Sequence, residues 1–284
     1  MQSFHLVVLG SETPVGQALT ELAQAQDISL HAISFKDWNL TDLAATQQKL
    51  KELEANFVIN CVMASPFGTT AKMAKVLARV CDEQGVGLLQ LSNNKVFAGQ
   101  DGELFKEEDQ PFPQSQAGQD VLAVEEAIAA CEQHMILRSG WLFSTQGEDD
   151  VTRLLALAQQ HRQLYLSDNK PLSPTSVEDV AAVLLAMVEQ ARFTELWGTY
   201  HYCSAEPTTL FKLSEVVVAE ARQHTALMVD DIYSDASHDM NALFAESAPK
   251  LACKKLLYTF GIKPKAWRPA LSRIVKSRYM AASS

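Results

Sequence analysis

A glycine-containing turn near the start of the chain has the residue types and spacing to hold a phosphate group. Gly10 ends a short apolar run and Gly16 follows it, with Thr13 where dinucleotide-binding turns carry a middle glycine. In such a turn, backbone N–H groups and the positive end of a helix stabilise a pyrophosphate. Here Thr13 adds a side chain, Pro14 removes an amide donor, and Glu12 adds negative charge. The turn therefore predicts a nucleotide-binding architecture with weakened binding of a dinucleotide.

The segment after the next apolar run differs from an NAD site. A carboxylate about 20 residues beyond the glycine turn would hold the ribose of NAD, but this chain has Ser34, Phe35 and Lys36 there. Lys36 is either a contact for the 2′-phosphate of NADP or a solvated lysine at the end of a strand. If a dinucleotide binds, the candidate contacts are Gly10, Thr13, Val15, Gly16, Lys36 and Asn60.

Apolar runs typical of buried strands alternate with helical patterns. We expect strands at 4–9, 29–33, 57–60, 87–92, 135–137 and 164–166, and helices after Pro14 and at 42–53, 70–82, 116–130 and 149–160. This alternation predicts an α/β protein with a Rossmann-like, doubly wound parallel sheet.

The second half of the chain is less regular. Helical patterns cover 180–190 and 210–223, a strand is expected at 199–203, and two short helical stretches flank the Gly261–Pro264 break. We therefore predict a Rossmann-like nucleotide-binding domain at 1–198 and a smaller C-terminal α/β lobe at 199–284. Residues 146–163 are expected to be able to pack with this lobe.

Composition and charge restrict the class of protein. The 284 residues are 47% hydrophobic, and the net charge is 24 − 34 = −10, which argues against nucleic acid as the main partner. No apolar stretch is long enough for a membrane span, and we expect a cytoplasmic protein. The five cysteines are scattered, and the histidines lack metal-ligand spacing, so we expect no metal and reduced cysteines.

The last part of the chain is basic. From Lys250 to Arg278 there are nine cations and no acid. The segment is either a solvated helical face that balances the acids around Asp230, or a surface for an anion or a protein partner.

Four motifs taken in order resemble one known family. They are Asn60 at the end of the third strand, LSNNKVFAG at 91–99, LRSGWLF at 137–143 and Ser-Pro-Thr at 173–175. Together they resemble the dTDP-4-dehydrorhamnose reductase family of extended short-chain dehydrogenases, across nearly the whole chain. The resemblance implies a Rossmann-like domain and a smaller lobe that would hold a nucleotide sugar.

The catalytic residues that the resemblance implies are missing. The family transfers a hydride with a hydroxyl residue near the fourth strand and a Tyr-x-x-x-Lys pair, in which the tyrosine exchanges a proton and the lysine lowers its pKa. The matching positions here hold Asn93, Ala117 and Val121, and none of the six tyrosines has a lysine four residues later. Only Ser92 and Lys95 remain as weak substitutes.

The sequence thus supports two classes of function. We expect a degenerate, non-catalytic member of the family that binds a nucleotide or metabolite, or regulates a protein partner, with a homodimer possible. No cofactor is expected, although NADP or NAD could bind with weakened affinity. The alternative is an NAD(P)H-dependent reductase or epimerase of a nucleotide-linked sugar with relocated catalytic groups. A third hypothesis is an interaction protein that uses the basic C-terminal segment.

Overall fold

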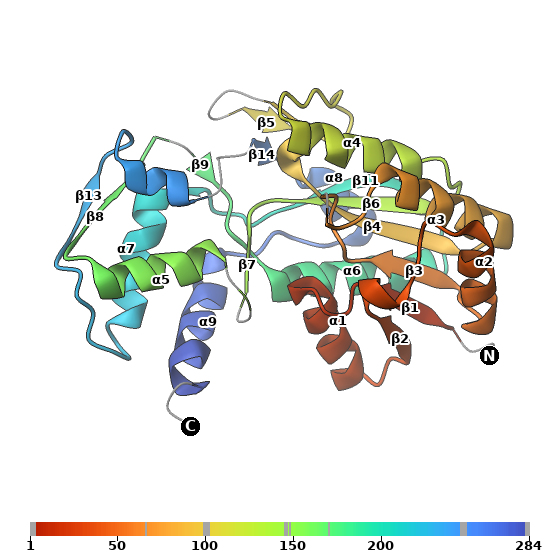
Figure 1. Ribbon diagram of the computed structural model, residues 1–284, viewed down its shortest axis with the longest axis horizontal. Helices are drawn as coiled ribbons and strands as arrows, with labels where there is room; N and C mark the ends of the chain where they lie inside the picture. The colour runs from red at the N-terminus through yellow and green to blue at the C-terminus, as the bar shows by residue number, and fades with distance from the viewer. Residues whose placement is uncertain are drawn as a thin grey trace.

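The computed structural model describes residues 4–65, 67–98, 103–144, 147, 149–169, 171–244 and 249–281. Gly99 of the fourth-strand motif and residues 146 and 148 of the predicted lobe segment lie outside these ranges. The centre of the molecule is a six-stranded parallel sheet (Figure 1). Its order is β11 (Gly198–Tyr202), β6 (His134–Ser139), β4 (Gly87–Asn93), β3 (Phe57–Asn60), β1 (Leu6–Leu9) and β2 (Leu30–Ile33).

Helices cover both faces of this sheet, which explains why β1 and β3 are continuous apolar runs rather than alternating ones. One face carries α1 (Pro14–Ala25) and α6 (Val177–Ala191), which pack on each other. The other carries α2 (Leu43–Glu52), α3 (Ala71–Gln84) and α4 (Gln116–Ile128) (Figure 1). The predicted fold class, a Rossmann-like doubly wound sheet, is confirmed.

Local sequence signals set where these helices begin. A side-chain oxygen at each N-cap accepts the N–H of the third helical residue, which satisfies one of the donors left unpaired at a helix start. The capping residues are Thr13, Asp42, Thr70, Ser115 and Ser176.

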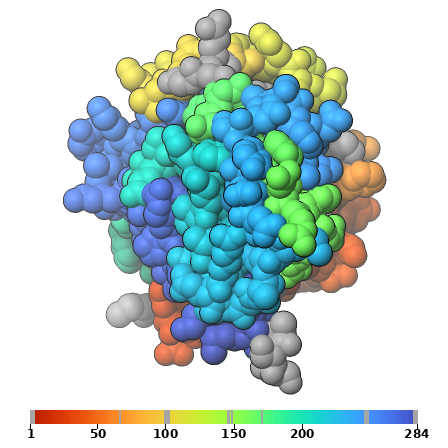
Figure 2. Space-filling model, turned by 90° about the vertical axis from the view of Figure 1, so that its left-hand side faces the viewer, coloured from red at the N-terminus to blue at the C-terminus, as the bar shows by residue number. Residues whose placement is uncertain are grey.

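A second group of elements packs beside the sheet. It comprises α5 (Asp150–Gln160), α7 (Leu210–Ala221), α9 (Trp267–Ala281) and the parallel pair β8 (Gln163–Leu166) and β13 (Asp231–Ser234). These elements share a core that includes the buried Trp267. Figure 2 shows β8 and β13 side by side next to α7 on the outer face of this group.

Further short strands pair outside the central sheet. Paired strands are β5 (Leu104–Phe105) with β14 (Lys250–Leu251), β7 (Leu142–Phe143) with β10 (Thr175–Ser176), and β9 (Pro171–Leu172) with β12 (Thr208–Thr209). The remaining helices are α8 (Lys254–Phe260) and the 3-10 turns η1 (Phe35–Asp37), η2 (Asn94–Val96) and η3 (Asp239–Leu243).

Two strands pair differently from what their place in the sequence suggests. The strand expected at 164–166 is β8, which pairs with β13 outside the central sheet, whereas the strand expected at 199–203 is β11, which forms the edge of that sheet beside β6. Apolar periodicity identifies a strand but not its partner. A division of the chain into two folding units at residue 198 stays a prediction.

Candidate functional site

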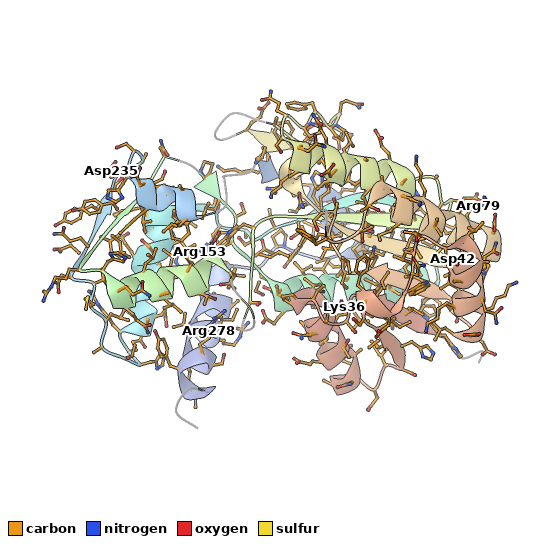
Figure 3. The ribbon with its side chains drawn as sticks, viewed as in Figure 1. Lys36, Asp42, Arg79, Arg153, Asp235 and Arg278 are labelled. Atoms are coloured by element: carbon orange, nitrogen blue, oxygen red, sulfur yellow. The ribbon has the colours of Figure 1, made fainter. Side chains whose placement is uncertain are left out.

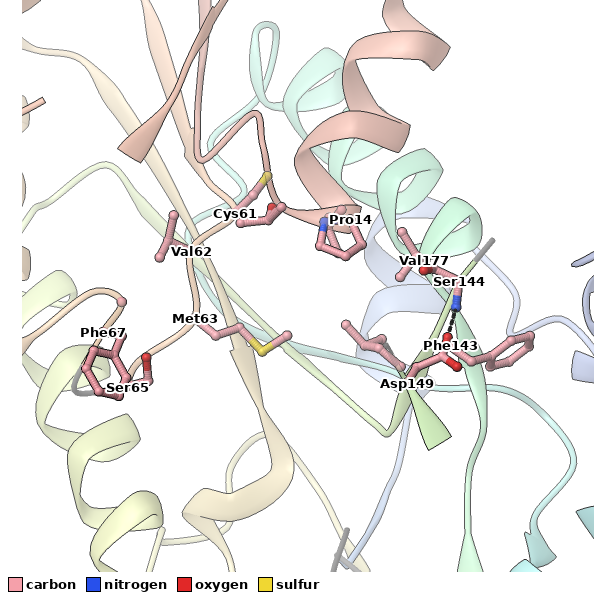
Figure 4. Close-up of a pocket in the computed structure, with 14 residues that line it drawn as sticks. Pro14, Cys61, Val62, Met63, Ser65, Phe67, Phe143, Ser144, Asp149 and Val177 are labelled. Carbon is pink, nitrogen blue, oxygen red and sulfur yellow. Dashed lines mark hydrogen bonds between the residues drawn. The ribbon is translucent and has the colours of Figure 1, made fainter. Parts of the chain in front are cut away.

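A cleft of about 400 Å³ lies above the glycine turn, at the carboxyl ends of β1 and β3. One wall comes from the first turn of α1 and from residues 61–63, 65, 67 and 68, and the opposite wall comes from residues 142–144, Asp149 and Val177 (Figure 4). Its lining is mostly apolar with a few polar groups, as is usual for ligand sites, and its volume falls in their range. In open parallel sheets, ligands bind beyond the carboxyl ends of the strands, so the cleft is the candidate site.

The two glycines of the turn are required by close packing. A side chain at Gly16 would place its Cβ 2.1 Å from the carbonyl oxygen of Gly10, so only glycine lets α1 approach the end of β1 this closely. Gly10 has φ +82°, and a Cβ there would lie 2.3 Å from Cγ2 of Val62. The backbone geometry that brings a helix N-terminus to the cleft is therefore retained.

The three substitutions in the turn interfere less than their sequence suggests. The hydroxyl of Thr13 donates to the Gly10 carbonyl (2.8 Å) and accepts the N–H of Gly16 (3.1 Å), so it is occupied within the turn. The Glu12 carboxylate accepts the N–H of Phe35 at 3.0 and 3.1 Å, which ties it to the end of β2. Pro14 does lack an amide donor, and the N–H of Gly16 is bound to Thr13. In the first turn of α1, this leaves the N–H of Val15, a residue that lines the cleft, as the available donor.

Lys36 directly follows Phe35 in the chain, and its side chain is exposed in η1 (Figure 3). The end of β2 thus carries both a cation and an acid where the adenosine part of a dinucleotide lies in doubly wound folds. These residues fit a dinucleotide phosphate at the helix N-terminus and, through Lys36, a 2′-phosphate at the end of β2.

Asn60 has a positioning role within the fold. It is fully buried, and its amide donates to Oγ1 of Thr69 (3.0 Å) and Oε1 of Gln90 (2.8 Å). Its Oδ1 accepts the N–H of Val62, which lines the cleft. Asn60 therefore fixes the segment after β3.

Asn93 lies next to the cleft with an amide that has a poor partner. Its Nδ2 donates to the thioether sulfur of Met63 at 3.8 Å, and Met63 lines the cleft. A thioether is a weak acceptor, so this amide has unused donor capacity. Its Oδ1 is fixed by the N–H of Lys95 (3.0 Å), which orients the side chain.

Ser92 belongs to a buried ionic network instead of the cleft. Its hydroxyl donates to Glu125 (2.6 Å). The Glu125 carboxylate also accepts hydrogen bonds from Nε and Nη2 of Arg138 at 2.7–3.1 Å. Nη1 of Arg138 lies 3.4 Å from Nε2 of His201. Burial, with a smaller contribution from the Arg138 charge, lowers the pKa of His201 to about 3, so this imidazole is neutral at ordinary pH. The network joins β4, α4, β6 and β11.

The positions of the missing catalytic pair have different surroundings. Val121 is buried on the inner face of α4, in an apolar cluster with Val96, Phe97 and Phe105. Ala117 is exposed, one residue before Gly118, where a Cβ would lie 2.3 Å from the Lys95 carbonyl oxygen. The side chain of Lys95 is exposed and does not line the cleft.

Sequence reasoning missed the second wall of the cleft. Asp149 caps α5 through the N–H of Thr152 (2.8 Å) and also accepts the N–H of Ser144 (2.8 Å). Arg278 of α9 donates to the Ser144 carbonyl (2.9 Å) and lies 3.6 Å from the Asp149 carboxylate (Figure 3). The signal that could have indicated this wall is Asp149, a residue type that caps helices, at the start of the helix expected at 149–160.

Several cations of the basic segment have internal partners. Lys265 pairs with Asp179, Arg268 with Glu206, and Nζ of Lys255 donates to the Thr199 carbonyl. The acids near Asp230 are not among these partners. Within the described ranges, no helix is long and apolar enough to cross a membrane, and no cluster of His, Cys, Asp or Glu has metal-site geometry.

The sheet, the glycine turn and the cleft define a Rossmann-like protein of the extended short-chain dehydrogenase class. The chain belongs to the RmlD substrate binding domain family, whose model matches residues 4–280. It is 27% identical to dTDP-4-dehydrorhamnose reductase of Sinorhizobium fredii over 95% of this chain and 96% of the relative, and 26% identical to that of Mycobacterium tuberculosis over 72% and 78%. The Bacillus anthracis dTDP-4-dehydrorhamnose reductase, solved in complex with NADP, has the same fold, with a TM-score of 0.83 and 19% identity over 97% of this chain and 100% of that one.

These relatives correct two expectations drawn from the sequence. A non-catalytic protein was expected, but relatives that match along the chain are named reductases, which favours the enzyme alternative. No cofactor was expected, but a reductase of the same fold has been solved with NADP. The expectation of weakened cofactor binding rested partly on Thr13 and Glu12 as obstacles, but hydrogen bonds hold their side chains to Gly16 and Phe35.

Proposed function

We propose that this protein is an NADP(H)-dependent reductase of a keto group on a nucleotide-linked sugar. The observation that carries the proposal is the cleft above the closely packed turn at Gly10 and Gly16, between the sheet and the wall formed by residues 142–144 and Asp149. The relatives' activity supports the same class of reaction.

The residues that would hold the cofactor lie at two places. The N–H of Val15 and the positive end of α1 would stabilise the pyrophosphate. Lys36 at the end of β2 would contact a 2′-phosphate, which favours NADP over NAD. When bound, the cofactor supplies the hydride.

Asn93 is the residue we assign to the substrate oxygen. Reduction of a ketone places negative charge on that oxygen, and a fixed amide N–H stabilises such charge. The Nδ2 group is oriented by the bond from Lys95 to Oδ1 and has only a weak acceptor in Met63. Without the family's tyrosine, the proton comes from water.

This assignment predicts a slow enzyme. Loss of a general acid costs about 10²- to 10⁴-fold in rate, whereas positioning of the hydride donor and the ketone is retained. Phe67, which is 98% exposed on the rim of the cleft, would cover the apolar face of the bound ligands.

The test is an Asn93→Ala variant compared with a Gln48→Ala control, which removes an exposed amide on α2. We expect kcat to fall by about 10²- to 10³-fold in Asn93→Ala. The Kd for NADPH should stay within about twofold, because Asn93 contacts the substrate and not the cofactor. An unchanged kcat would remove Asn93 from the mechanism, and a lost NADPH affinity would place it in cofactor binding instead.

A further inference from the structure

Two cysteines far apart in the sequence meet between the sheet edge and the C-terminal segment. Cys203 directly follows β11 and is buried, and Cys253 precedes α8 and is partly exposed. Their sulfur atoms are 3.6 Å apart although 50 residues separate them. Both thiols also face the same carbonyl oxygen, that of Leu251, at 3.5 and 3.6 Å.

This arrangement is unlike that of the other cysteines. Cys61, Cys81 and Cys131 are buried, with none exposed by more than 2%. Burial raises the pKa of Cys61 to about 12 and that of Cys131 to about 11, which makes both thiols inert. In the close pair, a hydrogen bond from the S–H of Cys253 stabilises the thiolate of Cys203 and so lowers the pKa of Cys203.

We propose that Cys203 and Cys253 form a dithiol that a low-molecular-weight disulfide oxidises to an intramolecular disulfide bond. The geometry requires the sulfurs to approach from 3.6 Å to a bonding distance of about 2 Å, which side-chain rotation can supply. The partial exposure of Cys253 gives the oxidant access.

The reaction balances as two successive thiol–disulfide exchanges. A thiolate of the pair attacks one sulfur of the small disulfide, which forms a mixed disulfide and releases one small thiol. The second cysteine loses its proton and attacks the protein sulfur of the mixed disulfide. The protein S–S bond forms, the second small thiol leaves, and the protein has lost two hydrogen atoms.

The bond would connect to a wall of the cleft through a short series of contacts. Ser204, next to Cys203, donates its N–H to Oγ1 of Thr175 (3.1 Å). Thr175 pairs with Leu142 in the β10–β7 ladder, and Leu142 lines the cleft. The disulfide would thus fix the end of the edge strand β11, which these contacts join to the wall of the cleft.

The test incubates the reduced, full-length protein with excess oxidised glutathione and counts free thiols. We expect a fall from five thiols to three, a loss of two hydrogens by intact mass, and a linked peptide pair containing residues 203 and 253. Cys203→Ser and Cys253→Ser should each prevent the linkage, whereas Cys131→Ser should not. The oxidised protein should unfold at a temperature higher by up to about 8 °C, because the bond closes a loop of 50 residues.

Five thiols remaining after oxidation would overturn the proposal, as would a disulfide that maps to Cys81 and Cys131. A stable mixed disulfide at Cys253 without linkage to Cys203 would also contradict it. These readouts do not depend on catalysis, so they are independent of the proposed reductase activity.

Discussion

Removal of Glu125 should destabilise the protein far more than an ordinary surface change. The side chains of Arg138 and Glu125 are only 5% and 4% exposed, and three hydrogen bonds join them. Glu125→Ala would leave the Arg138 guanidinium buried without its anion and the Ser92 hydroxyl without its acceptor. Loss of one partner of a buried ion pair costs about 3–5 kcal/mol. For a chain of this length we expect the melting temperature to fall by about 6–10 °C.

Thermal unfolding gives the melting temperature and urea unfolding gives the free energy of unfolding, both followed by tryptophan fluorescence and circular dichroism. The matched control is Glu83→Gln, which breaks the exposed ion pair with Arg79 and should leave the midpoint almost unchanged. A double variant, Glu125→Leu with Arg138→Met, should cost less than Glu125→Ala, because it leaves no unpaired buried charge. If Glu125→Ala lowers the free energy of unfolding by less than about 1 kcal/mol, the claim that Arg138 depends on Glu125 for its buried charge is refuted.

Three further predictions concern the turn, the cofactor and pH. Gly16→Ala should abolish NADPH binding and lower stability, because its Cβ would lie 2.1 Å from the Gly10 carbonyl oxygen; retained binding by calorimetry would show that α1 can shift freely. Lys36→Met should raise the Kd for NADPH about 10-fold and leave that for NADH unchanged, in line with the loss of one charged hydrogen bond; an equal change for both cofactors would exclude a 2′-phosphate contact. His201 has its pKa lowered from an ordinary value of about 6.5 to about 3, so its neutral form contributes stability above pH 6.5 that is lost as the pH falls toward 3. Between pH 6 and 4, the free energy of unfolding of His201→Asn should therefore fall by about 1.4 kcal/mol less per pH unit than that of the unmodified protein. Parallel plots of this free energy against pH would count against a buried neutral imidazole.

The sequence predicted the sheet and its helices because their signals are local. The strand expected at 57–60 matches β3 residue for residue, and Thr13 caps α1 as its position before Pro14 indicates. It could not predict the pairing of β8 with β13 or the place of β11, since both depend on contacts between distant segments.

The candidate site was predicted on one side only. The turn at Gly10–Gly16 has a motif, but the opposite wall does not, because Ser144 and Asp149 are brought there by packing of α5 and α9. The sequence also could not predict where a side chain points. Glu12 lies within the turn, yet its carboxylate accepts the N–H of Phe35.

The most direct test of the proposed function measures NADPH oxidation with a nucleotide-linked 4-keto sugar, using dTDP-4-dehydrorhamnose as the substrate of the named relatives. NADPH binding is measured in parallel by calorimetry. The proposal predicts saturable NADPH binding and slow turnover that depends on both substrates and falls in Asn93→Ala. Absence of NADPH binding, or binding with no turnover of any 4-keto sugar nucleotide, would contradict it.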